Sequence, residues 1–182
     1  MEHIITKLED RSIPLEHRLN LITSDLCKMQ SDDSTFLMKL FKKQFIPNDI
    51  YMKVLDFDCL LYKQKKYGET ALMNAFEYYG SNLNCDSKVL LKLLDVDCEP
   101  NKQDINGVTA LMYAFQYYGS NPNCDSQVFL KLLDLDCEPN KQNILYSTAL
   151  MYAFKYYGSN PNCDSQVLLK LLNFDCNPNS VN

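Results

Sequence analysis

The chain has 182 residues, a formal net charge of −5 and a pI near 5.0, and 46% of its residues are hydrophobic. This length suggests one domain, and the hydrophobic content is enough for a continuous core, which excludes wholesale disorder. The acidic balance argues against non-specific nucleic-acid binding, because such binding depends on an excess of Lys and Arg.

Residues 1–34 are predicted to form a helical cap on the rest of the chain. Helical spacing is shown by Leu15, Leu19, Ile22 and Leu26. The opening MEHIITKLEDRS has no long apolar region and carries acidic residues, so it does not resemble a secretory signal. No apolar run approaches the roughly 20 residues of a membrane helix. We therefore expect an intracellular protein with no membrane partner.

A period of 39 residues dominates the chain from Thr70 onward. Thr70 begins the string TALMNAFEYYGSNLNCDSKVLLKLLDVDCEPN, and nearly the same string returns from Thr109 and Thr148, at offsets of 39 (109 − 70 and 148 − 109). A fixed period of this size indicates stacked copies of one supersecondary unit, none of which buries its apolar face alone. Such a stack presents an extended surface rather than an enclosed pocket, which favours binding over catalysis.

An earlier, degraded copy of the unit precedes these three. TFLMKLF at residues 35–41 echoes TALMYAF, and VLDFDC at residues 54–59 echoes LLDVDC. We therefore divide the chain after the cap into four copies, numbered 1 to 4, which span residues 35–66, 67–104, 105–143 and 144–182.

Each full copy is predicted to contain a turn, a helix, a polar loop and a second helix. In copy 3, Asn106-Gly107 can adopt positive φ in the turn, and Thr109 can cap a first helix over ALMYAFQYY. After the loop SNPNCDS, Asp125 or Ser126 can cap a second helix over QVFLKLLDL.

The eight cysteines are predicted to be reduced thiols packed as small hydrophobic side chains. They occupy two repeated positions and one site in the cap: Cys85, Cys124 and Cys163; Cys59, Cys98, Cys137 and Cys176; and Cys27. Equivalent residues in neighbouring copies should lie about 10 Å apart, whereas a disulfide needs Cα atoms within about 7 Å. No Cys-x-x-Cys pair indicates a zinc site. The alternative is an artefactual disulfide or a redox role.

No constellation of residues predicts catalysis. His3 and His17 lie outside the copies, and the sequence has no G-x-S-x-G, no Gly-rich phosphate loop and no H-E-x-x-H. The recurrent acidic residues are expected at solvated helix ends or turns: Asp95, Asp97, Asp134 and Asp136. We therefore expect a protein that is not an enzyme and has no metal or cofactor.

The repeated unit resembles the ankyrin repeat, whose pattern runs D-x-x-G-x-T-P-L-H-x-A-A and ends its second helix in L-L-x-x-G-A-D-x-N. In copy 3 the matching residues are Asp104, Gly107, Thr109, Leu111, Ala114, Leu132, Leu133, Cys137 and Asn140. Ala110 replaces the usual Pro, Met112 the usual His, and Asp136-Cys137 the usual Gly-Ala. Most of the length beyond the standard unit of about 33 residues falls in the GSNPNCDS loop. The resemblance implies an all-α ankyrin-repeat solenoid with long inter-helix loops.

The combination TALMYAF…YYGSNPNCDS…LLKLLDxDC is similar to the ankyrin-repeat proteins of poxviruses, over roughly residues 35–179. That resemblance implies an adaptor of the host cytoplasm, in which the repeats bind a host protein and a C-terminal F-box-like segment recruits a cullin-based ubiquitin ligase. Several members act on innate immune signalling, including NF-kappa-B. Because no F-box-like segment follows copy 4 here, we expect a short or truncated member without direct ubiquitin-ligase recruitment.

In the ankyrin arrangement, the first helices and turn tips line a concave groove, which implies a partner-binding surface. The first-helix positions that the core does not need are Asn74, Glu77, Tyr78, Tyr113, Gln116, Tyr117, Tyr152, Lys155 and Tyr156. Tyrosine suits an interface, because it covers a large area with few rotatable bonds and offers a hydroxyl. The alternative is that Tyr117 and Tyr156 fill space between copies. The second Tyr of each YYG is expected to pack inside: Tyr79, Tyr118 and Tyr157.

The turn tips differ more between copies than the helices do, and they carry apolar residues where polar ones would be usual. The candidate partner-binding residues there are Tyr67, Ile105, Leu145 and Tyr146. Tyr146 replaces the turn glycine of the other copies, which predicts an altered turn in copy 4. The alternative for all the tips is drift in loops that nothing uses.

Three functions remain open from the sequence. The first is a host-protein-binding module that acts by occupancy, and the second is a truncated relic of a ubiquitin-ligase adaptor. The third is a structural protein that self-associates through the C-terminal edge of the stack, which changes of Leu171 or Leu172 to Lys would prevent. The edge lacks an obvious polar cap, which indicates a longer ancestor that was cut short.

Overall fold

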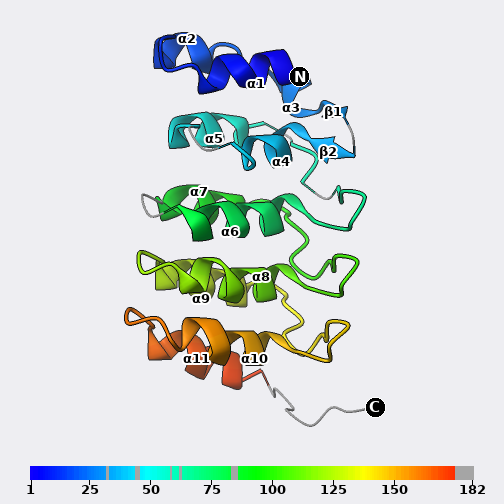
Figure 1. The fold of residues 1–182 in the computed structure, drawn as a ribbon, viewed down its shortest axis with the longest axis vertical. Coiled ribbons are helices and arrows are strands. Elements are labelled where there is room, and N and C mark those ends of the chain that lie inside the picture. Colours follow the sequence, from blue (N-terminus) through cyan, green and yellow to red (C-terminus); the bar gives the residue numbers. More distant parts are fainter. Residues whose placement is uncertain (32, 44–45, 58, 62, 83–85, 175–182) are drawn as a thin grey trace.

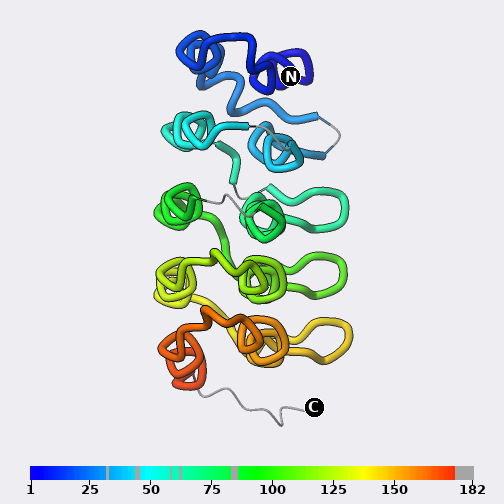
Figure 2. Tube along the Cα trace, turned by 60° about the vertical axis from the view of Figure 1, so that its left-hand side comes forward, coloured from blue at the N-terminus to red at the C-terminus, as the bar shows by residue number. Residues whose placement is uncertain are grey.

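The computed structural model describes residues 1–31, 33–43, 46–57, 59–61, 63–82 and 86–174, which are mostly helical. Helix pairs lie one above another along the long axis of the molecule, with the N-terminal helices at one end (Figure 1). Figure 2 shows the first helices of the pairs in one column and the second helices in a neighbouring column. Hairpin-like turns project from the column of first helices, on the side away from the second helices.

The cap consists of short helices rather than one long helix. These are α1 (Glu2–Glu9), α2 (Leu15–Leu19) and α3 (Ser24–Cys27). A two-stranded antiparallel ribbon follows, made of β1 (Gln30–Ser31) and β2 (Ser34–Thr35), in which Gln30 pairs with Thr35. The helical spacing from Leu15 to Leu26 is thus divided into two helices, because Thr23 is extended and its hydroxyl accepts the Leu26 N–H as an N-cap.

Each of copies 1 to 4 contributes a helix pair. The bounds are α4 (Phe36–Leu40) and α5 (Asn48–Val54); α6 (Ala71–Ser81) and α7 (Ser87–Leu93); α8 (Ala110–Gln116) and α9 (Ser126–Asp134); α10 (Ala149–Tyr152) and α11 (Ser165–Leu172). A 3₁₀ turn, η1 (Tyr118–Ser120), follows α8, and a π-helical segment, η2 (Ala153–Tyr157), follows α10. Nearly identical sequences therefore end their first helices in different ways.

Side-chain caps start the helices where the sequence predicts them. The hydroxyls of Thr35, Thr70 and Thr109 accept the N–H three residues further on, at 3.3, 3.3 and 3.4 Å. Asp86, Asp125 and Asp164 cap the second helices by accepting the N–H two residues further on. These caps satisfy N–H groups that a helix leaves without partners at its start. Thr148, at the same position in copy 4, is the N-cap of α10 without a side-chain hydrogen bond.

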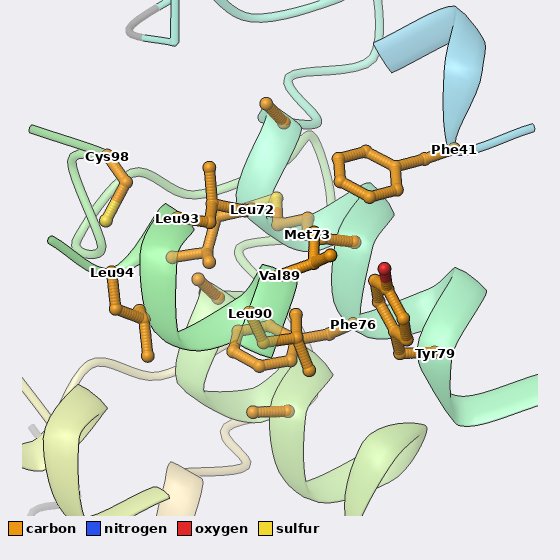
Figure 3. Close-up of a cluster of buried hydrophobic side chains, with 14 of the residues drawn as sticks. Phe41, Leu72, Met73, Phe76, Tyr79, Val89, Leu90, Leu93, Leu94 and Cys98 are labelled. Atoms are coloured by element: carbon orange, nitrogen blue, oxygen red, sulfur yellow. The ribbon is translucent and has the colours of Figure 1, made fainter. Parts of the chain in front are cut away.

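The core runs through the whole stack between the two columns of helices. Figure 3 shows Met73 and Phe76 of α6 close to Val89 and Leu90 of α7, all of them buried. The second tyrosine of each YYG, expected to pack, is buried in every copy: Tyr79, Tyr118 and Tyr157. The prediction that these second tyrosines pack inside is thereby confirmed.

The long inter-helix loops are fastened to the preceding copy. The Asn121 amide donates hydrogen bonds to the carbonyls of Tyr79 at 2.8 Å and Asn82 at 3.0 Å. The Asn160 amide repeats the contact one copy later, on Gly119 and Asn121, at 2.8 Å each. Both amides belong to buried residues, so the loop that exceeds the usual unit length satisfies backbone carbonyls between copies.

Ion pairs connect the second helices of successive copies. Lys131 pairs with Asp95 and Lys170 with Asp134, both at 2.5 Å, and Lys92 pairs with Asp56 in the same way. The aspartates are more than half exposed, as the sequence predicts for Asp95 and Asp134. Exposed pairs of this kind contribute between about 0 and 1 kcal/mol each, so they adjust the register of the stack more than its stability.

The three turn tips share one backbone geometry, and the predicted alteration in copy 4 is wrong. Gly68 and Gly107 adopt φ values of +82° and +74°, and Tyr146 adopts +58° at the equivalent position. In each tip, the N–H of this residue donates to the carbonyl three residues earlier, at 2.8 to 2.9 Å. Tyr146 is therefore held in the left-handed region, at a cost of roughly 1–2 kcal/mol, because its turn makes the same backbone hydrogen bond as the glycine-containing turns.

The cysteines that the structure describes are free thiols: Cys27, Cys59, Cys98, Cys124, Cys137 and Cys163. Four of them are buried, which agrees with packing as small hydrophobic side chains, whereas Cys124 and Cys163 are half-buried. Cys85 and Cys176 lie outside the described residues. No helix in the described part of the chain is long and apolar enough to span a bilayer.

Candidate binding surface on the first helices and turn tips

The turn tips are joined to one another by backbone hydrogen bonds. The Ile105 N–H donates to the Tyr67 carbonyl at 2.9 Å, and the Ile144 N–H donates to the Asn106 carbonyl at 2.8 Å. The Gln103 amide adds a bond of 3.0 Å to the Gln142 carbonyl. We call this connected edge, made of residues 65–69, 104–108 and 143–147, the turn-tip ridge. Its tips are held at fixed spacing, as a preorganised interface requires.

Apolar side chains project from this ridge into solvent. Tyr67 and Ile105 are more than half exposed, and the exposed fractions of Leu145 and Tyr146 are 75% and 72%. The sequence-based selection of these four residues as exposed tip residues agrees with the structure. It missed Ile144, which is 64% exposed and stands at the position of Ile105 in the next copy. Comparing the three tips position by position would have found it.

A copy-specific polar pair ties each tip to its own first helix. In copy 3 the Tyr113 hydroxyl donates to the Asp104 carboxylate at 3.2 Å, and in copy 4 the Asn143 amide donates to the Tyr152 hydroxyl at 3.0 Å. In copy 2 the pair at these positions is Lys65 and Asn74. The residue types at these two positions thus differ between the turns, but a hydrogen bond joins the two side chains in each case.

These pairs correct the sequence-based placement of three candidate residues. Asn74, expected on the open groove, is only 6% exposed, because it accepts from Lys65 and donates to the Thr70 carbonyl at 2.6 Å. Tyr113 and Tyr152 are half-buried, and their hydroxyls already hold the tips. What they offer to a partner is therefore ring surface, while the hydroxyl contacts support the ridge.

Burial favours the protonated form of Tyr113 and Tyr117. Burial raises the pKa of Tyr113 well above its usual range, and the neighbouring Asp104 carboxylate raises it further. Burial also raises the pKa of Tyr117, with the charge of Glu77 as the next cause. Burial lowers the pKa of Lys65, against which Glu69 acts at 3.6 Å. The tyrosines thus remain neutral and can act as hydrogen-bond donors.

Four tyrosines of the expected groove form ring pairs in copies 3 and 4, and we call them the groove tyrosines. Tyr113 and Tyr117 have their ring centroids 5.5 Å apart, and Tyr152 and Tyr156 have theirs 5.8 Å apart. The Lys155 ammonium lies 4.8 Å from the centroid of the Tyr156 ring. These separations are typical of favourable aromatic and cation–π contacts. Such contacts restrict the orientation of the rings, and the rings stay partly open to solvent.

Tyr78 differs from its counterparts in the later copies. Its ring is half-buried and lies 5.8 Å from Tyr51 and 6.0 Å from Phe41, so it belongs to an aromatic cluster between copies 1 and 2. Tyr117 and Tyr156 are also half-buried, which agrees in part with the interpretation that they fill space between copies. Glu77 and Lys155 are exposed, and Gln116 is half-buried, so the charge at this repeat position changes from acidic in copy 2 to basic in copy 4 at the surface.

No family model and no curated protein matches this chain. Its residues must therefore indicate the function by themselves. Among the described residues, no group of three or more His, Cys, Asp or Glu side chains could hold a metal ion. A hollow beside the exit of copy 2 is open to solvent and lined mainly by charged and amide side chains: Glu99, Pro100, Asn101, Lys102, Gln103 and Lys141. The apolar ridge and its tyrosines are the better candidate for recognition.

Copy 4 exposes a second apolar surface, which the sequence analysis placed only as an edge of the stack. It consists of Met151, Phe154, Leu169 and Leu172, which we call the terminal face. The residues at the positions of Met151, Phe154 and Leu172 in copy 3 are Met112, Phe115 and Leu133, all buried. Repeated sequence could not show this difference, because exposure depends on what packs against a copy.

Proposed function

We propose that the chain is an ankyrin-repeat solenoid that binds a host protein through the turn-tip ridge and the adjoining groove tyrosines. The period of 39 residues, the Thr-capped helix pairs and the shared turn geometry support this assignment. The observation that carries it is the row of exposed apolar side chains on tips that hydrogen bonds hold together. Apolar groups exposed on a rigid edge gain free energy when a partner removes them from water.

The partner is a protein that presents an apolar strip bordered by hydrogen-bond acceptors. Aliphatic tips and aromatic rings form the centre of the surface, whereas the charged residues Glu77 and Lys155 lie two copies apart, on α6 and in η2. Such an apolar and aromatic centre is typical of the energetically dominant part of a protein–protein interface. The chain acts by occupancy, so it masks or competes for a surface without chemistry.

From the resemblance to poxvirus ankyrin-repeat proteins, we propose that this activity belongs to the host cytoplasm and controls innate immune or NF-kappa-B signalling. In this proposal the chain acts without catalysis and without a cofactor. The alternative proposal is a relic of a ligase adaptor that retains the binding surface and has no effect of its own.

Affinity capture from host-cell lysate tests the proposal. The variant Tyr117→Ala/Tyr156→Ala removes ring surface and keeps the Tyr113 and Tyr152 hydroxyl contacts that hold the tips. We expect it to retain less than about a tenth of a captured protein, because truncating interface aromatics costs about 2 kcal/mol or more. A matched control changes the exposed Gln127 and Gln166 of the second helices to Ala and should retain the protein.

Three other results of the capture are informative. Equal retention by the native chain and a folded tyrosine variant would exclude the groove tyrosines as the binding surface. Loss in the control variant alone would move the site to the second helices. Capture of no protein by the native chain would favour the relic.

Self-association is a second candidate function, and the terminal face is the observation that favours it. Phe154 is 54% exposed and Leu172 45% exposed, although their counterparts in copy 3 are buried. The position of Asp56, Asp95 and Asp134 is occupied by Asn173 in copy 4, which removes a negative charge from this edge. A surface that pairs with itself benefits from this neutrality, because a two-fold contact places like groups near one another.

Sedimentation over a concentration series tests this second candidate. We expect the native chain to form dimers as its concentration rises, and Leu172→Lys to remain monomeric at all concentrations. Leu171→Lys is not suitable for this purpose, because Leu171 is buried and the change would unfold copy 4. A native chain that stays monomeric at high concentration would contradict self-association.

A further inference from the structure

Two thiols meet at one carbonyl where the cap joins copy 1. Cys59 follows α5 and its Sγ donates to the Val54 carbonyl at 2.8 Å, while the Sγ of Cys27, at the end of α3, lies 4.0 Å from the same oxygen. Both side chains are buried, at 1% and 3% exposure. The two sulfurs thus come from segments far apart in the sequence and share one acceptor.

The repeated architecture accounts for only one of these thiols. In copy 3 the Cys137 thiol donates to the Leu132 carbonyl at 2.9 Å, which is the same contact that Cys59 makes in copy 1. Cys27 belongs to the cap and has no counterpart among the copies. The repeated unit therefore does not account for the Cys27 sulfur, which lies at the junction between the cap and copy 1.

The electrostatic surroundings set Cys27 apart from the other buried cysteines. Burial raises the pKa of Cys98 to about 11 and that of Cys137 to about 12. For Cys27, the polar contact with the Cys59 side chain lowers the pKa and outweighs the effect of burial. Because the thiolate is the reactive form, this lowering favours Cys27 as the attacking thiol.

We propose that Cys27 and Cys59 form a peroxide-sensitive dithiol that closes to a disulfide and locks the cap onto copy 1. The Cys27 thiolate attacks hydrogen peroxide, the O–O bond breaks, and a sulfenic acid forms as hydroxide leaves and is protonated to water. The Cys59 sulfur then attacks the Cys27 sulfur, the S–O bond breaks, and the Cys59 proton leaves with a second water. In sum, two thiols and one peroxide give one disulfide and two waters.

The lock acts on a junction made of small elements. The helix α3 has four residues, and the β1–β2 ribbon has two residues in each strand. A disulfide between Cys27 and Cys59 encloses α4 and α5 in a covalent loop. Such a link restricts the unfolded chain and stabilises the folded one. The proposal is independent of the partner-binding function.

Peptide mapping after peroxide treatment tests the proposal directly. The full chain is treated with hydrogen peroxide, quenched, unfolded in an alkylating reagent and digested. We expect a linked pair of peptides that contain Cys27 and Cys59, with the mass of two hydrogen atoms lost. Cys98 and Cys137, which are also buried, should be recovered as alkylated thiols. Recovery of Cys27 and Cys59 as free thiols, or an equal yield of a Cys98–Cys137 link, would overturn the proposal.

Single variants separate the two chemical roles. In Cys59→Ser, a sulfenic-acid trap such as dimedone should label Cys27, whereas in Cys27→Ser it should leave Cys59 unlabelled. Helicity is compared first, and thermal unfolding gives a second measurement that does not depend on the trap. Oxidation should raise the Tm of the native chain by roughly 5 °C or more and should leave the Tm of either variant unchanged. Labelling of Cys59 in Cys27→Ser, or an equal Tm rise in the variants, would contradict the assigned roles.

Discussion

Replacing Phe115 with Ala is expected to lower the free energy of unfolding by about 3–5 kcal/mol. Phe115 is completely buried in copy 3, where its ring stacks on Phe129 at 5.1 Å between centroids and lies 6.0 Å from Tyr157 of copy 4. The substitution leaves a cavity that touches two copies, so both lose packing. Urea unfolding followed by circular dichroism measures the loss.

Phe154 offers a matched control, since it occupies the same repeat position one copy later. It is 54% exposed, so Phe154→Ala should change the free energy of unfolding by about 1 kcal/mol or less. An equal loss in both variants would show that the terminal face is covered in solution. Such a result would support self-association or another contact on that face.

Replacing Gly107 with Ala is expected to destabilise the chain by about 2–4 kcal/mol. Gly107 has a φ of +74°, and an added Cβ would lie 2.9 Å from the Cα of Asn143 in the next turn tip. The substitution therefore combines backbone strain with a clash against backbone, which cannot rotate away. The measurement is the midpoint of unfolding together with the slope, to establish that only stability has changed.

Tyr146 provides the opposite substitution at the equivalent position. Tyr146→Gly removes the strain of a non-glycine residue at positive φ, which should stabilise the fold by roughly 1–2 kcal/mol. The greater freedom of Gly in the unfolded chain should lower the stability by about 0.5–1 kcal/mol. We expect unchanged stability or a gain of up to about 1 kcal/mol. A clear loss would mean that the Tyr146 ring makes stabilising contacts and is not an idle exposed side chain.

The sequence predicts the local features of this fold well. Helix caps such as Thr109 and Asp125 depend on residues a few positions apart, so their pattern appears within one copy. The buried tyrosine of each YYG follows from the same pattern. The period of 39 residues predicts the helix pairs because each copy encodes the same unit.

Contacts between copies could not be read in the same way. Asn121 looks like an ordinary polar loop residue, but its amide binds carbonyls of the preceding copy. Asn74 looks exposed, but it is buried against Lys65, a residue that is replaced by Asp104 and Asn143 at the equivalent positions of the later turns. Tyr146 looks like a break in the turn pattern, although hydrogen bonds across the turn force it into the geometry of glycine.

The sequence predicts the exposure of the tip residues better than that of the groove residues. The tip residues Tyr67, Ile105, Leu145 and Tyr146 are exposed, as predicted from their variation between copies. The groove tyrosines are only half-exposed, because their hydroxyls and rings also contact the tips and neighbouring helices. The turn-tip ridge is therefore the part of the surface with the largest apolar area open to a partner.

The most direct test of this function is the affinity of a purified captured protein for the native chain and for a ridge variant. The variant Ile105→Ser/Leu145→Ser/Tyr146→Gly removes exposed side chains only, and its glycine suits the positive φ of its turn. Titration calorimetry should show a Kd weakened at least about 10-fold, with the Gln127→Ala/Gln166→Ala control unchanged. An unchanged Kd for the folded ridge variant would contradict the proposal that the turn-tip ridge binds the partner.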